Sequence, residues 1–297
     1  MIVLSEAPEQ VSPNASAREI AAITRVADLL GFRVYTIPPT FERCGSAENA
    51  LAHIPRQDTV VAGLWIGYIP TPERYAAIYT AALDKGIRLP NTPAQHRTAM
   101  EFDQFYPLLE GLTPRSVIIR AVEACAAAGD ALGYPVFVKG VVQSRKVRGW
   151  RACVAENREE LERLAANLFE LDNRTRGRVV VRELVRLRYT RTSDAGFPAG
   201  REFRYVVYDG RILAHGYYWD GEDPLGVLST EEEATVAALV KRGVERLNVP
   251  YVAIDIGQVE SGEWTIIEVG DGQFAGHSQI PLLELWNRLR DVNSRVD

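Results

Sequence analysis

Two apolar segments near the C-terminal end of this chain, residues 251–256 and 265–269, are each interrupted by one acid, Asp255 and Glu268. A turn at residues 260–263 joins them into a β-hairpin in which the two acids lie directly opposite each other. Like charges directly opposed destabilise a sheet, and a carboxylate among apolar side chains is costly unless it is paired. The hairpin therefore needs a positive partner between its strands.

A divalent cation satisfies that need, since Mg²⁺ typically takes one or two carboxylates together with substrate phosphates. Asp271, in a Gly-Asp-Gly sequence just beyond the hairpin, is a candidate third ligand. Because the opposed acids repel, we expect removal of either to leave the stability of the nucleotide-free protein equal or higher. The alternative is a different register, in which both carboxylates face solvent.

A lysine and a basic loop upstream are candidates for binding phosphate. Lys139 ends a strongly apolar strand, and a lysine in that position is either a point charge for phosphate or a side chain reaching water. The following residues 141–150 contain glycine, Ser144 and Lys146 and are rich in basic side chains. Such a loop closes over a triphosphate, with backbone N–H groups and Lys146 meeting its oxygens, or is an ordinary basic turn.

Two further strand ends complete the set of candidates. Glu183, Leu184 and Val185 follow an apolar strand, and their backbone is predicted to pair with an adenine edge unless this is only a capped strand end. Glu202 and Arg204 share one face of the next strand. Arg204 is a candidate for stabilising charge on a transferred phosphoryl group, and the alternative is a surface Arg–Glu pair worth ~0–1 kcal/mol.

The order of helical and strand patterns predicts a mixed α/β and α+β fold. Residues 1–112 alternate strands and helices, which indicates a small parallel sheet, and they lack the G-x-G-x-x-G motif of a dinucleotide site. Beyond them, we expect strands at residues 136–138, 152–154, 179–181, 203–208 and 212–219, and helices at 120–131, 156–171, 230–246 and 282–292.

Composition sets broad limits on the setting of the protein. The net charge is −5, so no general attraction to nucleic acid is expected. No apolar run approaches the ~20 residues that span a bilayer, and the first residues do not read as a secretory signal. Three widely separated cysteines suit free thiols in a reducing compartment. We therefore expect a cytoplasmic protein without membrane contact.

Taken in order, a strand lysine (Lys139), a Gly/Ser-containing loop (143–150), a Glu-Leu-Val hinge (183–185) and acids on a terminal hairpin resemble the ATP-grasp superfamily. The ending at residues 271–276 and the Arg-Glu-Phe-Arg sequence at 201–204 look most like its divergent arginine-arginine-lysine clade, which includes a cell-division-cycle factor that assembles a translation initiation complex. Lys139 and Arg204 match the clade's lysine and one arginine. The second arginine, expected within residues 212–219, is absent there.

The resemblance implies three units: a Rossmann-like domain over 1–112, a lid subdomain of the ATP-grasp fold over 113–182, and a metal-binding subdomain over 183–297. It also implies ATP and Mg²⁺ as cofactors. The function hypothesis is activation of a small-molecule or peptide carboxylate as an acylphosphate, which an amine or thiol nucleophile then attacks. The alternative is a non-ligase ATP-binding assembly factor that acts on a protein partner.

Overall fold

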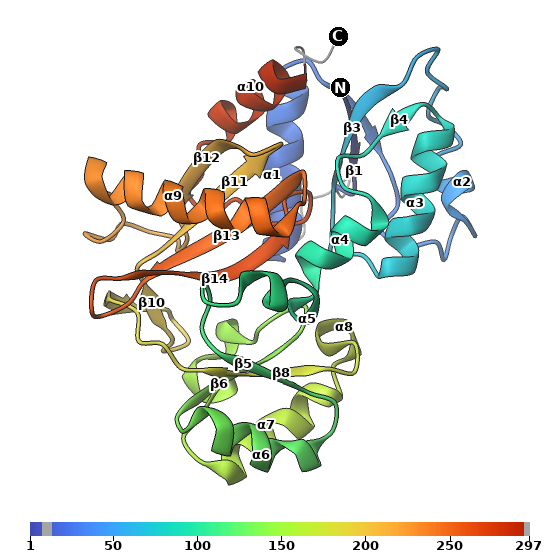
Figure 1. Ribbon diagram of the computed structural model, residues 1–297. Coiled ribbons are helices and arrows are strands. Elements are labelled where there is room, and N and C mark those ends of the chain that lie inside the picture. The colour runs from blue at the N-terminus through green and yellow to red at the C-terminus, as the bar shows by residue number, and fades with distance from the viewer. Residues whose placement is uncertain (8–13, 294–297) are drawn as a thin grey trace.

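The computed structural model describes residues 1–7 and 14–293 and contains three four-stranded sheets, with helices packed on them (Figure 1). A separate two-stranded hairpin, β9 (Tyr189–Thr192) and β10 (Pro198–Gly200), projects from the second half of the chain. Within the described ranges, no helix is long and apolar enough to cross a membrane.

The first sheet is parallel, in the order β2-β1-β3-β4, as the alternating sequence pattern predicts. Its strands are β1 (Ile2–Ser5), β2 (Arg33–Thr36), β3 (Val61–Ile66) and β4 (Ile87–Arg88). The connecting helices are α1 (Ala15–Leu29), the short α2 (Ala47–Ala50) and α3 (Pro72–Asp84). Thr71 caps α3 by accepting a hydrogen bond from the Arg74 backbone, and Pro72 stands in the first turn, where its missing N–H costs nothing.

The second sheet is antiparallel, in the order β5-β8-β6-β7. Its strands are β5 (Ser116–Ile119), β6 (Val136–Gly140), β7 (Val154–Ala155) and β8 (Val179–Glu183). One face is covered by α6 (Cys125–Leu132) and α7 (Arg158–Phe169), and the short α8 (Asp172–Thr175) follows α7 (Figure 1). Buried leucine and alanine side chains of α7 recur at helical spacing and pack into this core.

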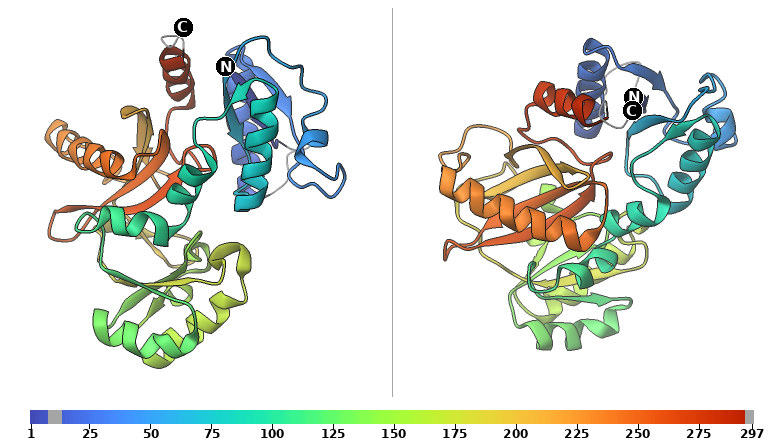
Figure 2. Two further views of the ribbon diagram at one scale, coloured as in Figure 1. Left: turned by 45° about the vertical axis from the view of Figure 1, so that its right-hand side comes forward. Right: turned by 45° about the horizontal axis from the view of Figure 1, so that its top comes forward.

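The third sheet is antiparallel, in the order β12-β11-β13-β14. It consists of β11 (Glu202–Tyr208), β12 (Arg211–Tyr217), β13 (Tyr251–Gln258) and β14 (Trp264–Asp271). Helix α9 (Thr230–Leu247) lies across one face, and α10 (Leu282–Asn293) packs beside α1 (Figures 1 and 2). Helix α9 begins with a capping box between Ser229 and Glu232 and ends at Asn248 in the left-handed conformation.

The segment between the first two sheets belongs by packing to the third. It forms α4 (Pro93–Met100), α5 (Phe102–Phe105) and a 3-10 turn, Tyr106–Leu109, whose apolar side chains join the core under α9. The first sheet thus ends well before residue 112. The second sheet extends to Glu183, one residue past the predicted boundary at 182, and the third sheet lies within residues 183–297. The domain boundaries themselves stay predictions.

The structure corrects several sequence-based expectations. The helix expected over 120–131 begins only at Cys125, because residues 116–119 form β5 and a short 3-10 turn intervenes. The β9–β10 hairpin was not expected, since β9 is short, polar and largely exposed, and β10 is a three-residue Pro-Ala-Gly strand without an alternating apolar pattern. Short edge strands of this kind give little hydrophobic signal.

A buried carboxylate holds the second sheet to the segment between the sheets. Glu101, at the end of α4, is bound by Arg97 at 3.2 Å, Arg176 at 2.6 Å and Arg178 at 2.8 Å. The two latter arginines precede β8, and Arg178 also binds Asp103. Burial alone would raise the pKa of Glu101, but the hydrogen bonds from the three arginines lower it to about 2.

We predict that Glu101→Gln lowers the free energy of unfolding by about 3–5 kcal/mol, because it leaves three arginines without their buried negative partner. Urea denaturation measures the change. The control is Glu162→Gln, which breaks the exposed pair with Arg158 and should cost ~0–1 kcal/mol. Equal losses in the two variants would contradict the role of Glu101.

The effect should also depend on pH in one direction. The folded-state pKa of Glu101 lies below its ordinary value of 4.5, so its stabilising contribution is present above that value. It should be lost as the pH falls through about 2. The difference in free energy of unfolding between wild type and Glu101→Gln should therefore narrow as the pH falls from 4.5 to about 2.

Candidate active site

The hairpin places the two predicted acids opposite each other. Asp255 on β13 pairs with Glu268 on β14, as expected. Nearer the turn, however, Ile256 pairs with Ile266, so the register there is shifted by one residue. A β-bulge at Ile267 absorbs the difference and restores the opposition of the acids.

Each acid has a cationic partner inside the protein. The Arg204 guanidinium, on the neighbouring strand β11, binds both oxygens of Asp255 at 2.7 and 2.8 Å. The Lys139 ammonium binds Glu268 from β6 of the second sheet. Lys139 and Asp255 are 1% and 3% exposed, whereas the Glu268 side chain is 31% exposed. The site therefore carries balanced charge across the space between two sheets.

Burial and these ion pairs together shift the pKa of both cations, Lys139 and Arg204. Burial lowers the pKa of Lys139, and the charge of Glu268 opposes this shift. Burial would also lower the pKa of Arg204, but the contact with Asp255 outweighs it and raises the pKa. The pairing reverses the expectation that removing one acid leaves or raises stability, because a buried cation would lose its partner.

A second charge pair joins the loop after β6 to β11. Lys146 lies 3.3 Å from Glu202, and its ammonium lies 5.4–5.8 Å from the ring centroids of Phe197, Tyr218 and Trp219. Burial raises the pKa of Glu202, and Lys146 opposes this shift. Rings around a cation stabilise its charge, so the pair is held in an apolar setting.

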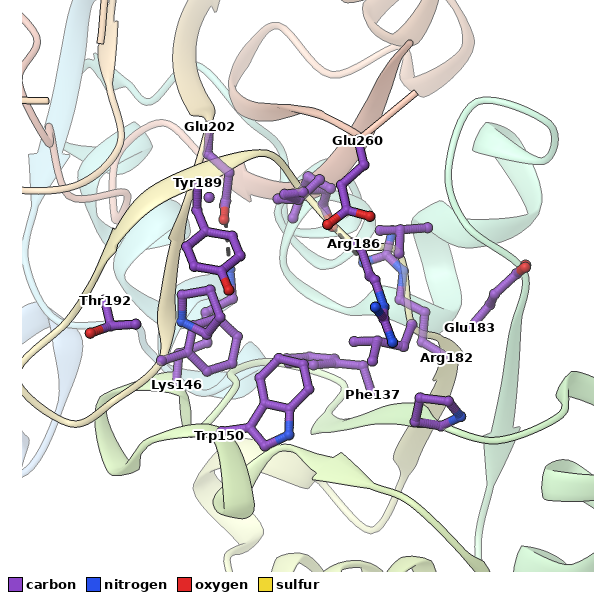
Figure 3. Close-up of a pocket in the computed structure, with 18 of the residues that line it drawn as sticks. Phe137, Lys146, Trp150, Arg182, Glu183, Arg186, Tyr189, Thr192, Glu202 and Glu260 are labelled. Atoms are coloured by element: carbon purple, nitrogen blue, oxygen red, sulfur yellow. Dashed lines mark hydrogen bonds and ion pairs between the residues drawn. The ribbon is translucent and has the colours of Figure 1, made fainter. Parts of the chain in front are cut away.

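Two cavities meet at Lys146, which lines both. One, of about 450 Å³, is bounded by the hinge at residues 183–187, by Phe137 and Trp150 of the second sheet and its loop, and by Glu202 (Figure 3). The other, of about 680 Å³, contains Asp255 and Glu268. Together they have a volume and a lining that suit a nucleotide and a second ligand.

The hinge residues present backbone rather than a carboxylate to the first cavity. Glu183 points away from it (Figure 3), is 43% exposed, and binds Arg115 at 3.2 Å. Leu184 and Val185 line the cavity, and within the described residues their N–H and C=O groups have no hydrogen-bond partner. Free backbone groups beside apolar walls suit the edge of an aromatic base.

Asp271 lies elsewhere. Its fully buried carboxylate binds His96 Nδ1 at 2.9 Å and accepts a hydrogen bond from the Gln273 backbone at 3.0 Å. It does not line the cavity that holds Asp255 and Glu268. Within the described residues, no group of three or more His, Cys, Asp or Glu side chains is arranged to hold a metal. The arrangement of Asp271 favours a role in joining β14 to α4.

Sequence reasoning did not assign a role to Arg182. This residue lies on β8 and lines the first cavity, beside Lys139 on the same face of the second sheet. The site thus contains a second arginine, on a different strand from the one expected. Its signal was a single charge within an apolar strand, which resembles the signal of Asp255 and Glu268.

The loop after β6 is fixed at several points. The Arg174 side chain donates to the Ser144 carbonyl at 2.7 Å, and Ser144 lines the second cavity. Gly149 adopts φ +85°, and a Cβ there would lie 2.2 Å from the Ala195 carbonyl oxygen. The loop therefore touches the turn of the β9–β10 hairpin at a point where only glycine fits.

Comparison with known proteins agrees with this arrangement. The sequence model of an ATP-grasp domain, family 3 of the arginine-arginine-lysine clade, matches residues 127–289. The chain belongs to this ATP-grasp family. The resemblance to the ATP-grasp superfamily and to its arginine-arginine-lysine clade is thereby confirmed. No curated protein matches the chain.

Solved ATP-grasp structures share the whole fold. D-alanine–D-alanine ligase from Bacillus anthracis with ATP aligns at TM-score 0.66 and 15% identity, over 99% of this chain and 97% of that one. A RimK-domain ATP-grasp protein from Sphaerobacter thermophilus aligns at 0.62 and 17%, over 98% of both chains. D-alanyl-alanine synthetase A from Vibrio cholerae aligns at 0.64 and 13%, over 99% and 97%. The two-subdomain ATP-grasp fold is confirmed, and the Rossmann-like character of the first domain stays a prediction.

We predict that Gly149→Ala loosens the ATP-grasp loop over residues 143–150, because both the left-handed φ and the contact with Ala195 disfavour a side chain. Trypsin should cut faster after Arg145, Lys146 or Arg148, by about tenfold for each ~1.4 kcal/mol lost. The control is Gly210→Ala, which has φ +74° but open space around its Cβ. Unchanged cleavage in Gly149→Ala would contradict the contact.

Proposed function

We propose that this ATP-grasp protein is an ATP-dependent ligase that activates a carboxylate as an acylphosphate and joins it to an amine or thiol. The observation that carries the proposal is the pairing of Asp255 with Arg204 and of Glu268 with Lys139. Asp255, Glu268 and Arg204 line the second cavity, and the buried Lys139 adjoins it through its contact with Glu268. Each acid can exchange its cation for a metal ion, and each cation can exchange its acid for a phosphate oxygen. ATP and Mg²⁺ supply both new partners at once.

The donor set fits magnesium. Asp255 and Glu268 are directly opposed, and both line the cavity. Two carboxylates with nucleotide phosphates are a usual Mg²⁺ environment, so a third acid is not required. When bound, Mg²⁺ would neutralise phosphate charge and polarise the transferred phosphoryl group. Asp255 and Glu268 would hold it.

The chain's own residues account for nucleotide placement. The backbone of residues 183–185 would meet the adenine edge, with Phe137 and Ile267 in the apolar wall of that cavity. Lys139 and Lys146 would then meet phosphate oxygens as point charges. Ser144 and the backbone of residues 143–150 would cover the triphosphate, with Glu202 beside Lys146.

In the first chemical step, an oxygen of the substrate carboxylate attacks the γ-phosphorus and ADP leaves. Lys139 and Arg204 would stabilise the charge on the transferred group. In the second step, the amine or thiol attacks the acyl carbon, loses its proton, and phosphate leaves. The loop over 143–150 would exclude water, which otherwise hydrolyses the acylphosphate.

We predict that Asp255→Asn and Glu268→Gln each reduce magnesium-dependent ATP turnover by at least about 10²-fold, because each removes one of two metal carboxylates. Release of ADP in the presence of mixed carboxylates and amines measures turnover. Asp271→Asn is the matched control, since its carboxylate faces α4. Normal turnover in Asp255→Asn or Glu268→Gln would contradict the metal site. ATP binding without any turnover in the wild type would contradict the ligase.

A further inference from the structure

Arg182 reaches from one sheet to the other directly behind the metal-binding acids. It lies on β8 of the second sheet, and its Nη1 donates to the Ile267 carbonyl of β14 at 2.6 Å. Its Nη2 lies 3.2 Å from the Ile266 carbonyl. The guanidinium therefore donates hydrogen bonds to two consecutive carbonyls of the opposite sheet.

Those carbonyls belong to the bulge that sets the register of the site. Ile266 still pairs with Ile256, and Ile267 is the extra residue that allows Glu268 to face Asp255. Without the bulge, β14 would shift by one residue, and a shift by one turns every side chain to the other face. The position of Glu268 thus depends on the local backbone that Arg182 binds.

Thr113 closes the network. Its hydroxyl donates to the Ile266 carbonyl at 2.8 Å and accepts from Arg182 Nη2 at 2.6 Å. Arg182, Thr113 and the bulge thus form one hydrogen-bonded ring that joins both sheets.

A buried guanidinium bound to neutral carbonyls is an unusual arrangement. Arg182 is 5% exposed, and within the described residues no carboxylate lies within ion-pair distance of it. Burial lowers the pKa of Arg182 to about 10, and the nearby charge of Glu268 partly offsets this shift. Arg182 thus remains protonated at neutral pH, stacked 5.5 Å from the Phe102 ring centroid. A residue needed only to fill space here would be apolar.

We propose that Arg182 is a positioning residue for the metal site: it fixes the β14 bulge and so holds Glu268 opposite Asp255. This role rests on the proposed function, because it assumes that the two acids bind Mg²⁺ with nucleotide. It assigns Arg182 no contact with the reacting atoms. Residues that orient metal ligands typically change metal affinity by about 10- to 100-fold when they are removed.

The test is calorimetric titration of ADP into the full chain, with and without Mg²⁺. Arg182→Met should raise the Mg²⁺ concentration at half-maximal enhancement of ADP binding about 10- to 100-fold, and should weaken ADP binding without Mg²⁺ by a smaller factor. Arg182→Lys keeps the charge but loses the fork across two carbonyls, so it should shift the same midpoint. Arg182→Lys also provides the test of the proposal if Arg182→Met fails to fold.

Two variants of Thr113 separate the effect of its hydrogen bonds from the effect of side-chain size. Thr113→Val removes the hydroxyl and should shift the Mg²⁺ midpoint in the same direction by a smaller factor. Thr113→Ser keeps the hydroxyl and should stay near wild type. Equal behaviour of the two Thr113 variants would contradict the network.

Three other results would overturn the proposal in distinguishable ways. If Arg182→Met and Arg182→Lys weaken ADP equally with and without Mg²⁺, Arg182 binds the nucleotide instead. If Glu268→Gln abolishes the Mg²⁺ enhancement while Arg182→Met leaves it unchanged, only the positioning role is wrong. If Glu268→Gln itself leaves the enhancement unchanged, the proposed metal site fails, and the positioning role fails with it.

Discussion

The contact between Lys139 and Glu268 joins two sheets of this ATP-grasp protein through their charged residues. Lys139 is almost wholly buried on the second sheet, and Glu268 stands on the third. A lysine charge buried to that extent is not stable without a negative partner. The two sheets must therefore face each other across these side chains, and the cavity beside them is lined by Asp255 and Glu268 together with Arg204 and Lys146.

Charge balance also explains how such a site can exist before nucleotide binds. Arg204 neutralises Asp255 through a two-point contact, and Lys146 neutralises Glu202 among three aromatic rings. Each pair joins one group suited to phosphate with one suited to a cation. Binding of a metal nucleotide would then exchange partners while keeping every charge compensated, which limits the desolvation cost.

The sequence could predict the opposition of Asp255 and Glu268, because like charges within apolar strands are a local signal that period-two alternation makes visible. It could not predict their cationic partners, since contacts of Lys139 with β14 depend on how two sheets pack. Asp271 shows the same limit. Its Gly-Asp-Gly context suggests a ligand, but the packing of α4 against β14 gives its carboxylate to His96.

The hinge at residues 183–187 and the bulge at Ile267 show the same limit for the backbone. The Glu-Leu-Val sequence lies at a strand end, as predicted, yet the side chain of Glu183 turns outward to Arg115. Likewise, the hairpin was predicted, but its register beside the turn is shifted by one residue, because a bulge adds a residue without changing the apolar pattern. Because the bulge could not be predicted from the sequence, the role of Arg182 in fixing it could not be predicted either.

A crystal structure with Mn²⁺ and a non-hydrolysable ATP analogue tests the central claim most directly, because Mn²⁺ can be located by anomalous scattering. The account predicts a Mn²⁺ peak bound by Asp255 and Glu268, with Lys139 and Arg204 turned to phosphate oxygens. A metal bound instead at Asp271, or both ion pairs intact beside the bound analogue, would contradict it.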